Sequence, residues 1–149
     1  MSKKVLLVTN SSTTLWLEQM ILKKYTTHEF VTAADGFEAV QRAVKEKPDL
    51  VLMDVVMPIM NGFEACRRIK LKKALKQVPV ILVTTRGDEQ CFTALLESGC
   101  TDSITKPIKP RELMAMIHCY LGGEKKPAQH FPNNLYAMRR AVPERFQSE

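Results

Sequence analysis

The chain has 149 residues, of which 45% are apolar and 26% charged, and its formal net charge is +6. This length suffices for one well-packed core, and no apolar run approaches the roughly 18 to 20 residues that a membrane-spanning helix needs. The first four residues lead directly into a short apolar run and not into a signal-peptide core, so we expect a cytoplasmic protein. The four cysteines form no Cys-x-x-Cys pair, which predicts buried thiols and not a metal or redox site.

Five short apolar runs alternate with five segments of helical period along the chain. Runs such as VLLV, LVLM and VILV have apolar residues at successive positions, which is typical of strands buried on both faces of a parallel sheet. The alternation therefore predicts an α/β fold, a doubly wound parallel sheet between two layers of helices. The expected strands are residues 4–8, 29–34, 49–54, 78–85 and 101–106, and the expected helices are residues 15–25, 36–47, 62–75, 88–98 and 111–121.

Polar and glycine residues indicate where several of these elements begin and end. The pairs Asp35–Glu38 and Asn61–Glu64 have the spacing of a capping box, which predicts two helix starts. Gly122-Gly123 is expected to end the last helix. Residues 122–149 contain Pro, Asn and mixed charge without a sustained period, so they are interpreted as a tail or linker that follows one domain over residues 1–121.

The residues just after the apolar runs form the predicted site. In an open parallel sheet, ligands bind beyond the carboxyl ends of the strands, so these residues should converge. A carboxylate can accept a phosphoryl group as an acyl phosphate, a hydroxyl can donate a hydrogen bond to a phosphoryl oxygen, and an ammonium group can neutralise its charge. The residues in question are Thr9 and Asn10 after the first run, Asp54 after the third, Thr84 and Thr85 after the fourth, and Lys106 followed by Pro107 after the fifth.

The segments LVLMDVVMPIMNGFEACRRIK, VPVILVTT and DSITKPIKPREL resemble the receiver domain of bacterial two-component response regulators, and the resemblance covers residues 3–121. It implies a flavodoxin-like (βα)5 topology with strand order 2-1-3-4-5, and a signalling module that is not an enzyme in the ordinary sense. It places Asp54 at the phosphoacceptor position, Thr84 and Lys106 at the phosphoryl-binding positions, and Pro107 at a position that commonly follows a cis peptide bond.

The chain departs from the family pattern after the first strand. There the family has two acids that hold Mg²⁺, and this chain has Thr9 and Asn10. Asp54, the backbone carbonyl of Val56 and the amide oxygen of Asn10 remain as oxygen ligands, and Mg²⁺ usually takes one or two carboxylates plus waters. Because Asp54 and Lys106 sum to zero charge, we expect Mg²⁺ to bind only weakly and phosphorylation of Asp54 to be slow.

Two further departures concern the switch that the family uses. The resemblance places Ser103 where an aromatic residue normally turns inward on phosphorylation, and serine cannot make that packing change. Thr85 stands where a smaller residue is usual and is expected to narrow access to Asp54. We therefore expect a receiver whose output depends weakly, or not at all, on phosphorylation. A normally phosphorylated response regulator that uses Asn10 and waters for Mg²⁺ is the alternative.

The resemblance also implies the partners. A sensor histidine kinase or phosphotransfer protein would phosphorylate Asp54 in a phosphorelay. A protein partner or a second receiver would bind the face made by the fourth helix, fifth strand and fifth helix. Its candidate contact residues are Cys91, Phe92, Leu95, Ser103, Met114 and His118.

Two hypotheses from other functional classes start from the same residues. TNSSTT after the first strand, residues 9–14, has the hydroxyls of a phosphate-binding loop such as flavodoxins use for FMN, but it lacks the glycines of such a loop. The basic run from Arg67 to Lys76, with further basic residues in the tail, has the charge of a DNA-binding surface. The tail has no helix-turn-helix or zinc pattern, so nucleic acid is the less favoured partner.

Overall fold

The computed structural model describes residues 2–85 and 92–122. Five parallel strands form one sheet in the order β2-β1-β3-β4-β5, which confirms the predicted fold class and topology. The strands are β1 (Lys4–Val8), β2 (Glu29–Ala33), β3 (Leu50–Asp54), β4 (Val80–Thr84) and β5 (Asp102–Thr105). The helices are α1 (Ser12–Tyr25), α2 (Gly36–Glu46), α3 (Gly62–Leu71), α4 (Phe92–Ser98) and α5 (Pro110–Leu121), with a 3-10 turn η1 (Lys73–Leu75) after α3.

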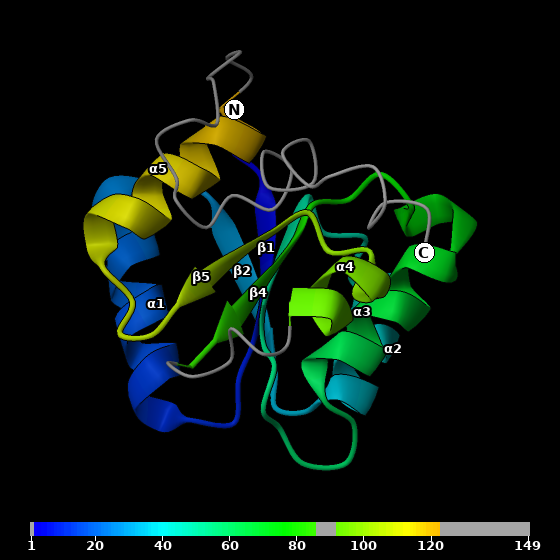
Figure 1. Ribbon diagram of the computed structural model, residues 1–149. Helices are drawn as coiled ribbons and strands as arrows, with labels where there is room; N and C mark the ends of the chain where they lie inside the picture. The colour runs from blue at the N-terminus through cyan, green and yellow to red at the C-terminus, as the bar shows by residue number, and fades with distance from the viewer. Residues whose placement is uncertain (1, 86–91, 123–149) are drawn as a thin grey trace, which may run out of the picture.

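Two hydrophobic cores lie on the two faces of the sheet. Helices α1 and α5 cover one face, and α2, α3 and α4 cover the other (Figure 1). Successive strand residues alternate between these cores. In β1, Val5 and Leu7 pack toward α1 and α5, whereas Leu6 and Val8 pack toward α2 and α3. Burial on both faces explains why the central strands contain almost no polar residue before their last position.

The first helix begins earlier than the sequence predicts. It starts at Ser12 because the Ser11 hydroxyl accepts a hydrogen bond of 3.1 Å from the Thr14 amide, which caps the helix. The third helix, in contrast, is shorter than predicted. It ends at Leu71, and Lys72 has extended backbone before η1. Part of the predicted fourth helix, residues 88–91, lies outside the described residues, and α4 is observed from Phe92.

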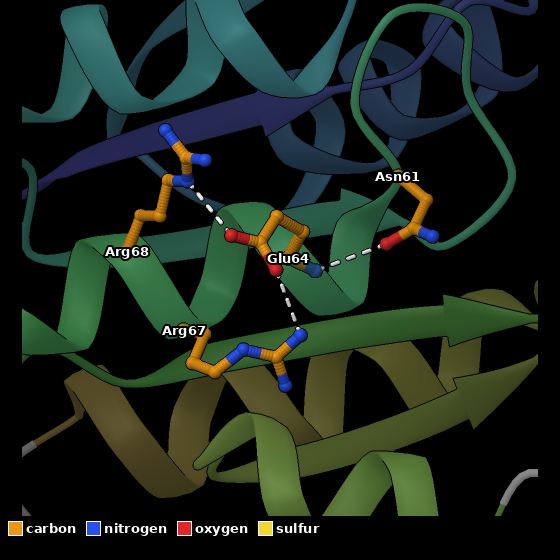
Figure 2. Close-up of polar contacts among 4 residues, drawn as sticks. All are labelled: Asn61, Glu64, Arg67 and Arg68. Carbon is orange, nitrogen blue, oxygen red and sulfur yellow. Dashed lines mark hydrogen bonds and ion pairs between the residues drawn. The ribbon is translucent and has the colours of Figure 1, made fainter.

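Asn61 caps α3 as predicted, with its amide oxygen 3.0 Å from the Glu64 backbone nitrogen. The Glu64 carboxylate forms ion pairs of 2.8 Å with both Arg67 and Arg68, one turn further along the helix (Figure 2). The first two positive charges of the basic run therefore share one carboxylate on their own helix, which offsets one of the two charges. This local pairing is typical of a solvated helix face and does not favour a dedicated nucleic-acid surface.

The cysteines are only partly as predicted. Cys66 and Cys100 are buried, whereas Cys119 is half-buried and packs at the margin of the core below α5. Burial raises the pKa of the Cys66 thiol to about 12, which keeps it protonated and unreactive. Cys91 and the predicted tail, residues 123–149, lie outside the described residues. Within the described part of the chain, no helix is both long enough and apolar enough to cross a membrane.

Candidate functional site

Three side chains meet at the carboxyl edge of the sheet. Asp54 is the last residue of β3 and is 3% exposed. Its Oδ2 atom accepts a hydrogen bond of 2.5 Å from the Thr9 hydroxyl and one of 3.2 Å from Lys106 Nζ. Thr9 directly follows β1 and Lys106 directly follows β5, so three strand ends that are distant in sequence form one site.

Backbone hydrogen bonds beyond the strands hold these residues in place. The Thr9 amide donates to the Ala33 carbonyl at 3.1 Å, and the Lys106 amide donates to the Thr84 carbonyl at 2.8 Å. The Lys106–Pro107 peptide bond is cis. Gly62 packs so closely behind Asp54 that a Cβ atom at position 62 would lie 2.4 Å from the Asp54 carbonyl oxygen. The backbone around the carboxylate is therefore fixed on several sides.

Thr84 lies at the same edge of the sheet, but the structure does not bring its hydroxyl onto Asp54. Thr84 ends β4 and Thr105 ends β5, and their hydroxyl oxygens are 3.3 Å apart. The sequence interpretation did not include Thr105. The strand register could have identified Thr105, because Thr84 and Thr105 are direct cross-strand partners at the ends of β4 and β5.

The remaining predicted residues divide into exposed and buried positions. Asn10, Val56 and Thr85 are exposed, and Ser103 is buried in β5. The Thr9 hydroxyl also accepts a hydrogen bond of 3.1 Å from the Ser11 amide, so the hydroxyls of this loop serve Asp54 and the cap of α1. That use does not favour a flavin phosphate cradle. Among residues 2–85 and 92–122, no three His, Cys, Asp or Glu side chains gather in a way that could hold a metal ion.

Glu18 on α1 is a component of the site that the sequence interpretation missed. Its side chain is 0% exposed, although its neighbours on the same helix face, Ile21 and Leu22, belong to the apolar core. Burial raises the pKa of Glu18 to about 9, the Asp54 carboxylate acts in the same direction, and Lys106 opposes both. An acid at position 18 between Leu15 and Leu22, on one helical face, was the available signal.

The site is close to electrically neutral at pH 7. Asp54 and Lys106 form a direct ion pair, with Lys106 the more exposed partner. Glu18 is protonated at that pH because its pKa is about 9. The arrangement therefore presents one carboxylate nucleophile, one ammonium group and several hydroxyls, which suits the binding or acceptance of a phosphoryl group more than the attraction of a free cation.

Comparisons with known proteins agree with this geometry. The model of the response regulator receiver domain matches residues 5–118. Protein PilH of Pseudomonas aeruginosa is 36% identical over 120 residues, which cover 80% of this chain and 98% of PilH. The alkaline phosphatase synthesis transcriptional regulatory protein PhoP of Bacillus subtilis is 35% identical over 121 residues, but these span only 49% of PhoP and 81% of this chain.

Solved structures show the same fold. The chemotaxis response regulator CheY4 of Vibrio cholerae is 30% identical with a TM-score of 0.75, and the match covers 81% of this chain and 100% of CheY4. The receiver domain of the sensor histidine kinase PA1611 of Pseudomonas aeruginosa, solved with a magnesium ion in its active-site cleft, is 26% identical. Its TM-score is 0.76, and the match covers 83% of this chain and 100% of that domain. Sequence and structure together show that this chain belongs to the response regulator receiver domain family of two-component signalling.

Proposed function

We propose that this receiver is phosphorylated only weakly at Asp54 and that it acts mainly through protein interactions with little dependence on phosphorylation. The observation that carries the proposal is the contact between Thr9 and Asp54. A hydroxyl donates to the carboxylate at 2.5 Å where the family has an acid for Mg²⁺. The site residues proposed from the sequence, Asp54 as acceptor and Lys106 as phosphoryl-binding cation, keep these roles.

The charge of the site explains the weak phosphorylation. Phosphoryl transfer is catalysed largely by positioning of the reactants and by neutralisation of the negative charge on the oxygens of the transferring phosphoryl group. Mg²⁺ supplies this chemistry when it is bound. With an effective dielectric constant near 20, the loss of one carboxylate a few ångströms from the ion costs roughly 4 kcal/mol per unit charge product, before desolvation and screening offset part of it. Since Thr9 and Asn10 replace two acids, Mg²⁺ affinity is reduced by orders of magnitude.

The oxygen atoms proposed from the sequence as metal ligands fit Mg²⁺ poorly. Asn10 and Val56 are exposed and contribute no charge, and Asp54 Oδ2 already accepts two hydrogen bonds. The Oδ1 atom of Asp54 is the better ligand, because it is buried and has no hydrogen-bond partner among the described residues. Because Asn10 and Val56 carry no charge, Asp54 is the only charged group among these three proposed metal ligands.

The proposed partner surface is the face formed by α4, β5 and α5. Two of the residues predicted for it, Leu95 and Ser103, are buried and cannot contact a partner, because Leu95 packs in the core under α4 and Ser103 lies inside β5. Phe92, Met114 and His118 retain exposed surface and remain candidates. We propose a protein partner or a second receiver as the occupant of this face.

Intact mass spectrometry after incubation with Mg²⁺ and acetyl phosphate tests the proposal. The expected result is little or no phosphoryl adduct on the wild-type chain, with circular dichroism showing that the protein is folded. Asp54→Asn is the matched control, because it removes the acceptor and keeps the size of the side chain. A rapid and nearly complete adduct on the wild type, absent from D54N, would instead show a normally phosphorylated response regulator.

A further inference from the structure

A second charged region lies at the edge of the sheet opposite Asp54. Helices α2 and α3 lie side by side on one face of the sheet (Figure 1), and the turn η1 packs against α2. The end of α2 leads into the start of β3, and η1 leads into the start of β4. These helix ends therefore lie at the amino edge of the parallel sheet, whereas Asp54 lies at its carboxyl edge.

The lysines at these helix ends are exposed and form no ion pair among the described residues. They are Lys45, Lys47, Lys72, Lys73 and Lys76, and together they are called the lysine patch. No acidic residue occurs between positions 65 and 85. The two acids beside the end of α2 face Lys4 instead, because Glu46 pairs with its ammonium group at 3.0 Å and Asp49 accepts a hydrogen bond of 2.9 Å from its amide. The patch therefore presents uncompensated positive charge.

Two aliphatic side chains are exposed beside the lysine patch. Leu71, the last residue of α3, is 80% exposed, and Val44, in the last turn of α2, is 46% exposed. Their helices have already buried their apolar faces through Ile69 and Ala43, so neither side chain has a place in the core. Exposed aliphatic groups next to lysines are typical of surfaces that bind at a membrane interface, where both kinds of side chain find a partner.

Other polyanions fit the lysine patch less well. An extended acidic peptide usually pairs with an edge strand or lies in a groove, and the patch lies on helix ends and not on the edge strands β2 and β5. Nucleic acid phosphates are often bound by arginine, and the nearest arginines, Arg67 and Arg68, share the carboxylate of Glu64. The phosphate backbone of DNA also provides no apolar contact for Leu71. A lipid leaflet provides anionic headgroups and apolar chains at one surface.

We propose that the lysine patch docks this protein on an anionic phospholipid surface, with the lysines at the headgroup phosphates and Leu71 inserted beneath them. Clusters of roughly four to eight basic residues are typical of surfaces that bind acidic lipids. Binding is reversible, because each lysine contributes little and salt screens it. Since Asp54 lies at the opposite edge of the sheet, the docked protein keeps that site open to the solution.

Flotation of the full chain with lipid vesicles at low salt tests this proposal. Vesicles of equimolar phosphatidylglycerol and phosphatidylcholine should carry the protein, and vesicles of phosphatidylcholine alone should not. The variant K72Q/K73Q/K76Q should lower the partition coefficient about a hundredfold, because each lysine near an anionic surface contributes a factor of about five. The matched control K23Q/K24Q/K109Q makes the same charge change at exposed positions elsewhere and should keep most of the binding.

Leu71→Ser tests the insertion at constant charge. It should lower the partition coefficient about fivefold, because the leucine side chain gains from leaving water. Circular dichroism checks that each variant is folded. No binding of the wild type to the anionic vesicles, or equal binding of the wild type and either folded variant of the patch, overturns the proposal.

Two soluble polyanions provide the remaining comparison. Retention of the protein by duplex DNA or polyglutamate at the same salt concentration, without binding to the anionic vesicles, would assign the lysine patch to a nucleic acid or protein partner and overturn the proposal. None of these results depends on phosphorylation of Asp54, so vesicle binding and the proposed weak phosphorylation stand or fall separately.

Discussion

Replacing Glu18 with glutamine is expected to remove much of the pH dependence of the stability of the metal-free protein. In the folded chain the pKa of Glu18 is about 9, against an ordinary value of 4.5, chiefly because the carboxyl group is buried and secondarily because Asp54 lies near it. Lys106 acts in the opposite direction. Glutamine has nearly the same shape as the protonated acid and does not titrate, so it isolates this one ionisation.

The sign and size of the effect follow from proton linkage. Between pH 4.5 and about 9 the unfolded chain has released the Glu18 proton while the folded chain still holds it. The unfolded state binds fewer protons in this pH range. The contribution of Glu18 to the free energy of unfolding is therefore fully present below pH 4.5 and is lost as the pH rises toward 9. One pH unit corresponds to about 1 kcal/mol, and the wild type should therefore lose about 2 to 3 kcal/mol relative to E18Q between pH 6 and pH 8.

Urea denaturation of both proteins, in the presence of a chelator and at several pH values, measures this difference. Circular dichroism is the better probe, because the only tryptophan, Trp16, is 61% exposed and already surrounded by water in the folded chain. The three histidines are common to both proteins, so their titration cancels in the difference. Parallel stability curves for the two proteins from pH 6 to pH 8 would refute the reasoning, because they would mean that Glu18 is hydrated or ionised in the folded state.

Three further predictions concern the loops around Asp54. Thr9→Val removes the donor to a buried carboxylate and should lower the free energy of unfolding by about 1 to 3 kcal/mol in urea, whereas Thr13→Val at an exposed position of α1 should have little effect. Gly62→Ala places a methyl group 2.4 Å from the Asp54 carbonyl oxygen and should cost at least about 1 to 3 kcal/mol, and an unchanged melting temperature would contradict the packing described. Asn10→Asp restores an acid at an exposed loop position and should raise Mg²⁺ affinity at least about tenfold by titration calorimetry; no change would show that position 10 does not face the ion.

Most of the fold could be predicted because each level of the sequence pattern points the same way. Runs such as VLLV and VILV specify strands that are buried on both faces, and Asn61 gives a helix start at the correct residue. The errors arise where short-range hydrogen bonds decide the boundary. The Ser11 hydroxyl starts α1 earlier than the apolar period does, and extended backbone at Lys72 interrupts a segment whose composition continues to favour helix.

The sequence predicted which residues at the strand ends form the candidate site, but it did not predict how their side chains are oriented. Asp54 and Lys106 converge because β3 and β5, which flank β4 in the sheet, both have their carboxyl ends at the same edge. That the Thr84 hydroxyl lies beside Thr105 and not on Asp54 depends on side-chain rotation, which no spacing encodes. Glu18 was missed because one acid among apolar residues is compatible with a helix surface, and only the packing of α1 on the sheet turns it inward.

Thr9, at a position where the family has an acid, changes the electrostatic balance of the metal-free site. Two aspartates beside Asp54 would repel it, and each close pair would cost roughly 4 kcal/mol at an effective dielectric constant near 20 unless a cation intervened. Thr9 replaces such a repulsion with a hydrogen bond to Asp54, and Glu18 avoids adding another by remaining protonated. The resting site is thus held together by its own side chains and needs no bound ion. The proposed function implies that the groups which stabilise the metal-free site also make it a poor site for phosphoryl transfer, so the two properties should change together in variants that place an acid after β1.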